Sequence, residues 1–525
     1  MNPMRLAGIS LVWMLAVILV SVSAVSAADI RGTIKLGGVI VDEDAGDLSV
    51  MQETYNIYEG FSATQLKLNG SLTPRTYFTL SLNDINLDNR KSDLEIWVPG
   101  QFRLFARYDQ HRQVFDPDRA LSSDRKDVRI GTWLTPVRWF TFSADYGHQT
   151  REGERLGFPA GTESALGNGY DYVLQTGRFE GEARKGPRAI AVAYDFSEYS
   201  DYQSDEADRF GYVVSARLRT PCHFTDKITH LLRAAYGKRE LANWDTDYTL
   251  QNFQYTGVAV PIRELQLKYN FYAGRIDDQS TRLKTDNFRN NFDATYFYPH
   301  GSVFGGYGYE MNDDDRSLTS YHTYRVGGSF RGPRGFAAKV EYASRTKKDE
   351  EKLTLLKDME AASFLAKAQV SPIDDFVLGV GYKERSREFC DIGVESEGLT
   401  ANAFGRYSYP QWGSVGVEYT YALDEYDNLI DEFDAESHTV TSRADFERVR
   451  GLRLGGGVTY MDVGKDLDIE KSILFMEAEY TLRENYHFEV KYNVYNYDDY
   501  ILLDRYYTAN IVWINVAYDF DFQKQ

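Results

Sequence analysis

The sequence predicts an all-β fold: a single large antiparallel transmembrane β-barrel of about 26 strands, with short periplasmic turns and long extracellular loops. Three observations predict this fold. Apolar and polar residues alternate with period two in segment after segment, tyrosine is abundant, and tight turns alternate along the chain with longer polar connections. In barrels of outer membranes, lipid-facing and lumen-facing residues alternate in this way along each strand.

The N-terminal residues 1–27 predict a secretory signal peptide. Arg5 provides a short basic start, an apolar run extends from Leu11 to Leu19, and small residues follow at Ser26 and Ala27. This order describes a signal peptide better than a spanning helix. We therefore expect two regions, a signal peptide at 1–27 and the barrel at 28–525.

The composition excludes a helical membrane protein and disfavours a nucleic-acid partner. Downstream of the signal peptide no window approaches the roughly 18 consecutive apolar residues of a spanning helix, and the mean hydropathy is -0.47. The 39 Tyr and 30 Phe suit strands and interfacial aromatic girdles. A net charge of -19 argues against binding to phosphate backbones, which reward Lys and Arg.

The strands are predicted from their alternation. In residues 336–342 the even positions are apolar, whereas Lys339 and Glu341 point the other way. The last strand, at 510–522, places Val512 and its even-numbered neighbours on one face and Asn515 on the other. An aromatic-rich final strand resembles the assembly signal of outer-membrane proteins, although the chain ends in Gln523-Lys524-Gln525 rather than in an aromatic residue.

The number of strands follows from the tight turns. They occur at Pro74, Pro99, Pro136, Gly186-Pro187, Pro221, Pro261, Pro299, Gly332-Pro333, Pro372 and Pro410, and at 448–451 and 483–485. A dozen such turns imply about 26 strands when both termini are periplasmic, each of about 10 to 12 residues. The short interval from Pro74 to Pro99 makes one hairpin uncertain, so the count lies between 22 and 26.

The connections at the opposite end are predicted to be longer, polar and often acidic. They are expected at 42–47, 151–169, 277–286, 312–317, 346–358 and 424–436. Cys222 falls at a tight turn and Cys390 in a loop of this second set. The two cysteines are therefore expected on opposite membrane faces, beyond the reach of a disulfide.

A barrel of this size encloses more space than the chain is expected to fill. About 26 tilted strands give a backbone radius of roughly 26 Å and a lumen roughly 35 to 40 Å across. Few residues separate the signal peptide from the first strand near Gly32, so no N-terminal plug is expected. The predicted plug is therefore another polypeptide.

Charged residues on the predicted lumen face are the candidate contacts to that partner. They are Arg217, Lys268, Lys339, Glu341, Glu418, Glu479, Glu489 and Lys491. Two interpretations stay open: ordinary wet lumen residues with cross-strand pairing, or a polar cradle complementary to an inserted partner.

Catalytic, metal and cofactor sites are not expected in this chain. The 8 His are scattered singly, and in Tyr321-His322 and Ser437-His438 neighbouring side chains on a strand point to opposite faces, so no enzyme is predicted. Acidic runs such as Asp313-Asp314-Asp315 lack the EF-hand spacing; they are read as solvated charge or as ligands for the divalent ions that bridge lipopolysaccharide. No C-x-x-C-H haem-attachment motif occurs.

The chain resembles the MtrB/PioB-type outer-membrane proteins. The resemblance rests on the predicted wide barrel without an internal plug and on two short sequence segments, Asn56-Ile57-Tyr58-Glu59-Gly60-Phe61 and Pro74-Arg75-Thr76-Tyr77-Phe78. It implies a barrel that sheathes a multihaem c-type cytochrome in its lumen, with haem carried by the partner and an extracellular cytochrome as a further candidate partner. Several members carry a C-x-x-C near the mature N-terminus, which this chain lacks.

Two other functions remain open on the sequence. A diffusion porin or substrate-specific solute channel would need fewer strands and a constriction loop, for which 151–169 is the candidate. The second is a non-catalytic surface receptor that uses the acidic loops.

Overall fold

The computed structural model describes residues 29–522, except 47–56, 58, 86–88, 117–120, 154–169, 203–207, 226, 242–245, 280–282, 315–316, 351–357, 391–392, 428–431 and 502–505. The predicted signal peptide, 1–27, therefore lies outside the described residues. Among the described residues, no helix is long and apolar enough to cross a membrane.

The described chain forms 26 strands. They are β1 (Asp29–Gly46), β2 (Gly60–Thr73), β3 (Thr76–Asn83), β4 (Arg90–Val98), β5 (Phe102–Asp116), β6 (Leu121–Val137), β7 (Phe140–Gly153), β8 (Tyr170–Lys185), β9 (Arg188–Asp201), β10 (Arg209–Pro221), β11 (Ile228–Leu241), β12 (Thr246–Ile262), β13 (Leu265–Asp278), β14 (Lys284–Tyr298), β15 (Gly301–Asp314), β16 (Ser317–Arg331), β17 (Ala337–Asp349), β18 (Met359–Ile373), β19 (Phe376–Phe389), β20 (Val394–Tyr409), β21 (Gly413–Asp427), β22 (Glu432–Phe446), β23 (Leu452–Lys465), β24 (Ile469–Leu482), β25 (Tyr486–Asp499) and β26 (Tyr506–Phe522).

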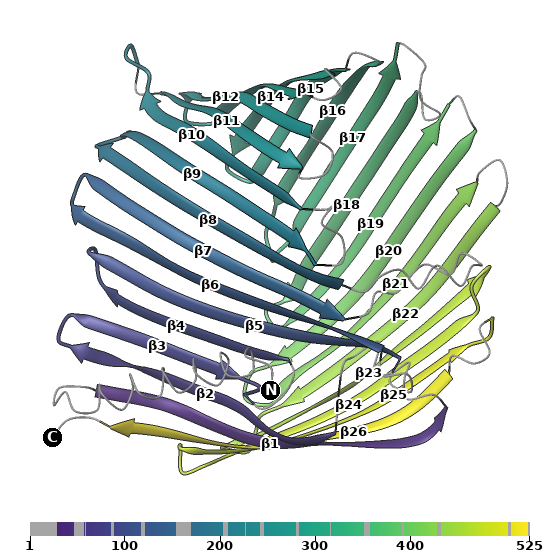
Figure 1. Cartoon of the computed structure of the whole chain (residues 1–525). Coiled ribbons are helices and arrows are strands. Elements are labelled where there is room, and N and C mark those ends of the chain that lie inside the picture. Colours follow the sequence, from purple (N-terminus) through teal and green to yellow (C-terminus); the bar gives the residue numbers. More distant parts are fainter. Residues whose placement is uncertain are drawn as a thin grey trace.

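The strands close into one antiparallel barrel (Figure 1). Each strand pairs with the next in sequence, and β1 pairs with β26 from Ile30 opposite Phe522 to Gly46 opposite Tyr507. Closure removes the unpaired edges that an open sheet would expose. The predicted fold class and the upper value of the predicted strand count are confirmed. The hairpin between Pro74 and Pro99, which the sequence left uncertain, is present: its strands β3 and β4 are short, with 8 and 9 residues.

The tight turns all lie at one end of the barrel, as the sequence predicts. Pro74 and Arg75 alone join β2 to β3, and Gly100, with φ of 72°, lies in the turn between β4 and β5. Four prolines expected in turns belong instead to strand ends. Pro221 is the last residue of β10, and Pro136, Pro261 and Pro372 lie where the register of the hairpin shifts. Proline cannot donate to the ladder, so a bulge accommodates it and the turn follows two or so residues later.

The connections at the opposite end are shorter than the sequence predicts. β1 extends to Gly46, β15 and β16 are separated by residues 315–316, and β21 and β22 by 428–431. The predicted loops at 42–47, 312–317 and 424–436 are therefore mostly paired strand. Both faces become polar where strands project beyond the membrane, so the alternation that marks a strand fades there although the backbone pairing continues.

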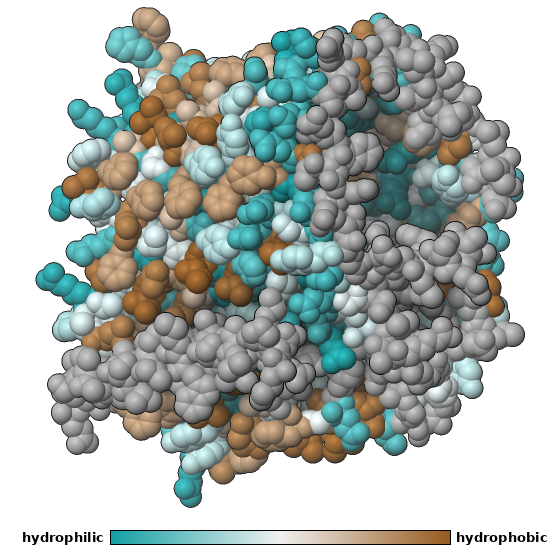
Figure 2. Space-filling model, in the orientation of Figure 1, coloured by the Kyte–Doolittle hydropathy of each residue, from teal (hydrophilic) through white to brown (hydrophobic). Residues whose placement is uncertain are grey.

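The outer face carries an apolar belt of membrane type. On β21, Val415, Val417 and Tyr419 point outward and are 54%, 51% and 41% exposed, and Glu425 and Asp427 continue this face at the loop end. Apolar side chains cover much of the outer surface in Figure 2. A closed barrel with such a belt satisfies its backbone within lipid. The chain is an outer-membrane barrel.

One buried apolar cluster lies on the inner face, near the loop end of β25 and β26. Tyr507, Ala509 and Ile511 are at most 2% exposed, and Tyr495 packs beside them. Ile57, from the connection between β1 and β2, packs against this cluster. That connection therefore places at least one apolar side chain inside the barrel.

Candidate functional site: the lumen wall

The register assigns every strand residue to one face. Directly opposed residues of antiparallel strands share a face, so the outward Val340 and Tyr342 place Lys339 and Glu341 inside. Followed around the barrel, the pairing places all the candidates on the inner wall: Arg217 on β10, Lys268 on β13, Lys339 and Glu341 on β17, Glu418 on β21, Glu479 on β24, and Glu489 and Lys491 on β25.

The structure brings these candidates together as local pairs rather than as one site. Lys339 contacts Glu341 at 2.8 Å and Lys491 contacts Glu489 at 2.7 Å. Glu489 also contacts Lys35, which lies across the β1–β26 seam.

The remaining candidates differ in their partners. Arg217 reaches Glu180 at 2.5 Å, and Glu418 accepts a hydrogen bond from Asn402 at 3.2 Å. Lys268 and Glu479 make no ion pair with any residue that the structure describes. The eight candidates are spread from β10 to β25, so they mark a wall and not a pocket.

Several inner-wall ion pairs skip a strand. Arg325 on β16 contacts Asp293 on β14 at 2.5 Å, above Gly306 of β15. A Cβ at Gly306 would lie 2.4 Å from Asp293 Oδ1 and 3.0 Å from Arg325 Nε, so only glycine leaves room for the pair.

A second pair repeats this arrangement on the neighbouring part of the wall. Arg385 on β19 contacts Asp424 on β21 at 2.8 Å. The intervening residue, Gly398 of β20, would place a Cβ 2.6 Å from Arg385 Nε. Inner-wall glycines therefore serve as gaps through which charged side chains meet across two strand spacings.

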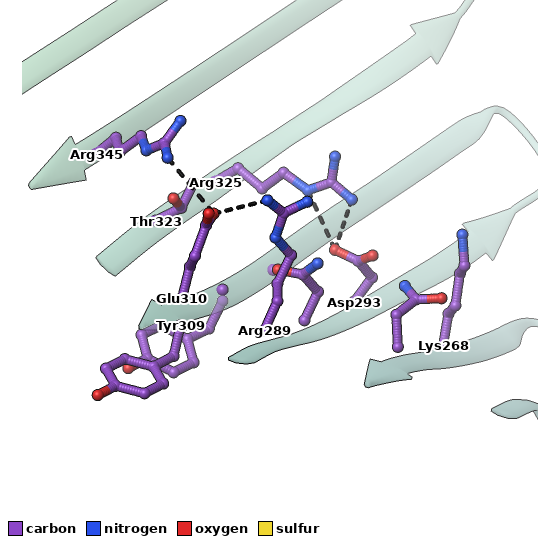
Figure 3. Close-up of a pocket in the computed structure, with 13 residues that line it drawn as sticks. Lys268, Arg289, Asp293, Tyr309, Glu310, Thr323, Arg325 and Arg345 are labelled. Carbon is purple, nitrogen blue, oxygen red and sulfur yellow. Dashed lines mark hydrogen bonds and ion pairs between the residues drawn. The ribbon is translucent and has the colours of Figure 1, made fainter. Parts of the chain in front are cut away.

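The first of these pairs belongs to a recess of about 410 Å³ in the wall of β13 to β17 (Figure 3). Arg289 and Arg345 both contact Glu310, at 2.9 Å and 3.5 Å, and Arg325 holds Asp293. Gly306 and Gly308 form part of the lining, and Lys268 lies at its edge. Three guanidinium groups are thus fixed by two carboxylates.

Sequence reasoning found only Lys268 of this recess. The sequence signal that could have found Arg289 and Asp293 is their alternation with the outward Phe292, which places both residues on the lumen face. Alternation does not reveal which residues of different strands lie side by side.

The inner wall is electrostatically two-sided. The inner face of β10 to β20, which we call the basic wall, carries Arg209, Arg217, Arg219, Arg233, Arg239, Lys268, Arg289, Arg325, Arg331, Lys339, Arg345, Lys347, Lys367, Lys383, Arg385, Arg387 and Arg406. The acidic residues on the same described strands are Asp278, Asp293, Glu310, Asp314, Glu341 and Asp349. Bases far outnumber acids there, in a chain whose net charge is -19.

The remaining inner face, on β21 to β26 and β1 to β9, is called the mixed wall. Acidic and basic side chains are close in number there and pair across strands. Arg129 contacts Asp145 at 2.7 Å, and Arg443 contacts both Asp445 and Glu477, at 3.0 Å and 2.9 Å. The positive excess of the lumen is therefore confined to one side.

The histidine-containing pairs that were rejected as catalytic sites have their side chains on the faces that the alternation predicts. Tyr321 points inward, while His322 lies outside against Tyr307 at 2.9 Å; His438 likewise lies outside and contacts Tyr419 at 2.8 Å. Both outward histidines therefore lie beside a tyrosine ring on the outer face. No group of three His, Cys, Asp or Glu able to hold a metal ion occurs among the described residues. That the chain is not an enzyme stays a prediction.

The acidic runs do not form single clusters within the described strands. Asp313 points outward and Asp314 inward, and residue 315 lies outside the described residues. Cys222 follows β10 at the turn end and Cys390 follows β19 at the loop end, and both are free. The predicted separation of the two cysteines is confirmed, whereas a contact to lipopolysaccharide stays a prediction.

Comparisons with known proteins give no family. No family model and no curated protein matches the chain. Among solved structures, it is similar to the FrpB iron transporter from Neisseria meningitidis, with 10% identity over 80% of this chain and 82% of that chain and a TM-score of 0.48. The siderophore receptor PirA from Pseudomonas aeruginosa is 11% identical over 94% of this chain and 80% of that chain, with a TM-score of 0.47. The ferric-catecholate import receptor Fiu from E. coli K12 is 11% identical over 94% of this chain and 82% of that chain, with a TM-score of 0.48. Likenesses this low do not bear on what the chain binds.

Proposed function

We propose that this barrel is the outer-membrane sheath of a multihaem c-type cytochrome and forms with it a transmembrane conduit for electrons. The observation that carries the proposal is the width of the closed barrel. Its 26 strands give a backbone radius of about 26 Å and leave a lumen about 35 to 40 Å across. A small folded domain, with a radius of gyration of about 13 Å, fits within that space.

The polar inner wall supports a protein occupant. Ion pairs such as Arg325–Asp293 and Arg443–Glu477 cross the wall, and the arginine side chains of these pairs are about half exposed. Figure 2 shows a hollow through which hydrophilic side chains are visible. A hydrated, charged wall suits a water-soluble partner, because such a partner has a polar surface and does not need an apolar face in order to bind. The partner supplies the haems, while the barrel holds them across the membrane and separates them from lipid.

The main alternative is a diffusion porin or solute channel. That function requires a segment folded into the lumen to narrow it, and residues 154–169 of the candidate loop lie outside the described residues. Ile57 is a described connection residue that lies against the inner wall. Conductance separates the alternatives, because an unplugged lumen of this width passes ions freely.

The test is isolation of the barrel from its native membrane in mild detergent, followed by haem staining, mass measurement and reconstitution. The proposal expects a stable complex that contains a haem protein, low ion conductance, and electron transfer across the bilayer to an enclosed acceptor. The barrel stripped of its partner is the control and should not transfer electrons. A haem-free barrel with a discrete, solute-sized conductance would exclude the sheath and favour the porin.

A further inference from the structure

The basic wall holds like charges close together. Lys339 of β17 lies directly opposite Lys367 of β18. On β19, Lys383, Arg385 and Arg387 occupy successive inward positions. Like charges that face each other across strands destabilise a sheet, and the low-dielectric wall of a barrel concentrates their field in the lumen. This arrangement gains stability when an anionic surface lies against it.

The acids of the basic wall are already engaged. Asp293 pairs with Arg325, Glu310 with Arg289 and Arg345, and Glu341 with Lys339.

Bases remain once these pairs are made. Arg233, Lys268, Lys367, Lys383 and Arg387 make no ion pair or side-chain hydrogen bond with any residue that the structure describes. They come from four strands, β11, β13, β18 and β19. The basic wall therefore presents free positive charge over a broad arc.

We propose that the basic wall docks an acidic face of the polypeptide in the lumen and so fixes the rotation of that partner about the barrel axis. This inference rests on the proposed function. The recess of β13 to β17 is its anchor, because Arg289, Arg325 and Arg345 are held in place before a carboxylate arrives, and pre-organised guanidinium groups bind carboxylates well. The mixed wall meets the opposite, less charged side of the partner.

A macromolecule fits these observations better than a small anion. Eleven adjacent strands, spaced about 4.8 Å apart and tilted about 40°, span an arc of roughly 70 Å. The bases extend along the strands from Arg331 at the turn end to Arg387 near the loop end. A solute contacts a few of these residues at once, whereas a folded surface contacts many, and complementary charge over such an area sets orientation.

The test compares two matched triple variants in the full barrel with its native partner. Lys268→Gln, Lys367→Gln and Lys383→Gln remove three bases from the basic wall. Lys67→Gln, Lys91→Gln and Lys471→Gln remove three lysines from the inner face of the mixed wall. The change in net charge and in chemistry is the same. The readout is haem protein retained per barrel during washes of increasing NaCl, with heat-modifiable migration as the check that both barrels have folded.

The basic-wall variant should bind its partner about tenfold more weakly, since each of three charged contacts contributes modestly. It should release the haem protein at a lower NaCl concentration than the wild type, because salt screens charged contacts. The mixed-wall variant should behave as the wild type. Equal retention by both variants overturns the inference and leaves the sheath intact. A wild-type barrel without haem protein overturns the sheath, and anion-selective conductance of that barrel assigns the basic wall to small anions.

Discussion

The assignment of faces can be tested by placing one arginine on either side of the same strand. Val417 of β21 points to lipid and is 51% exposed, whereas Thr420, three residues further along, points into the lumen opposite Asn402. Val417→Arg should destabilise the barrel, and Thr420→Arg should not. Both changes add one positive charge to the same strand.

The expected magnitude follows from the height of Val417 in the membrane. A rise of about 3.4 Å per residue and a tilt of about 40° give about 2.6 Å of height per residue. Val417 lies four residues after Gly413, the start of β21, and therefore about 10 Å above the turn end of an apolar band about 25 Å tall. An arginine near the midplane costs about 2 to 4 kcal/mol, whereas one in the wet lumen costs less than about 0.5 kcal/mol.

The assay is equilibrium unfolding of the barrel from lipid vesicles by denaturant, with tryptophan fluorescence as the signal. The wild type and both variants are compared at one lipid composition. A larger loss of stability for Thr420→Arg than for Val417→Arg would falsify the face assignment for this strand. Every strand is linked to its neighbours by register, so that result would reverse the faces of the whole wall.

Three further predictions use other parts of the structure. Gly457→Ala should cost about 1 to 3 kcal/mol in the same unfolding assay because its Cβ would lie 2.1 Å from the backbone oxygen of Ser442. Gly398→Ala should cost less than about 1 kcal/mol, because its Cβ meets only the side chains of Arg385 and Asp424, which can move, and no backbone atom. A larger loss of stability for Gly398→Ala than for Gly457→Ala would contradict this reasoning. An impermeant maleimide should label Cys390 on intact cells and Cys222 only after permeabilisation, and mass spectrometry of labelled peptides decides this. Partial burial, together with the nearby Glu388 and Glu360, raises the pKa of the Cys390 thiol, so its labelling at neutral pH should be slower than that of free cysteine and should accelerate as the pH rises through the raised pKa. Protease added to intact cells should cut within 346–358 or 151–169 if it cuts at all, and N-terminal sequencing that finds cleavage at Gly332-Pro333 would invert the topology.

The sequence alone determined the architecture because two local signals carry it. Alternation with period two assigns each residue to a face, which is why Lys339, Glu418 and Lys491 could be placed in the lumen before the structure was known. Proline and glycine at tight turns mark one end of each hairpin, and a dozen such turns imply the observed number of strands. Both signals are read within a few residues of chain.

The extent of the strands needed the tertiary structure. Glu425 and Asp427 continue β21 beyond the apolar belt, where a polar environment on both faces removes the pattern although the pairing persists. The sequence-based loop at 424–436 was wrong for this reason.

The recess and the two-sided charge of the wall also came only from the tertiary structure. Arg325 and Asp293 are 32 residues apart in sequence, and Arg385 and Asp424 are 39 apart. Each pair meets because the register aligns two strands around an intervening glycine. Alternation states which way a side chain points, but not its height relative to a neighbouring strand. Closure of the barrel then decides which strands share a wall, and so gathers the bases of β10 to β20 on one side of the lumen.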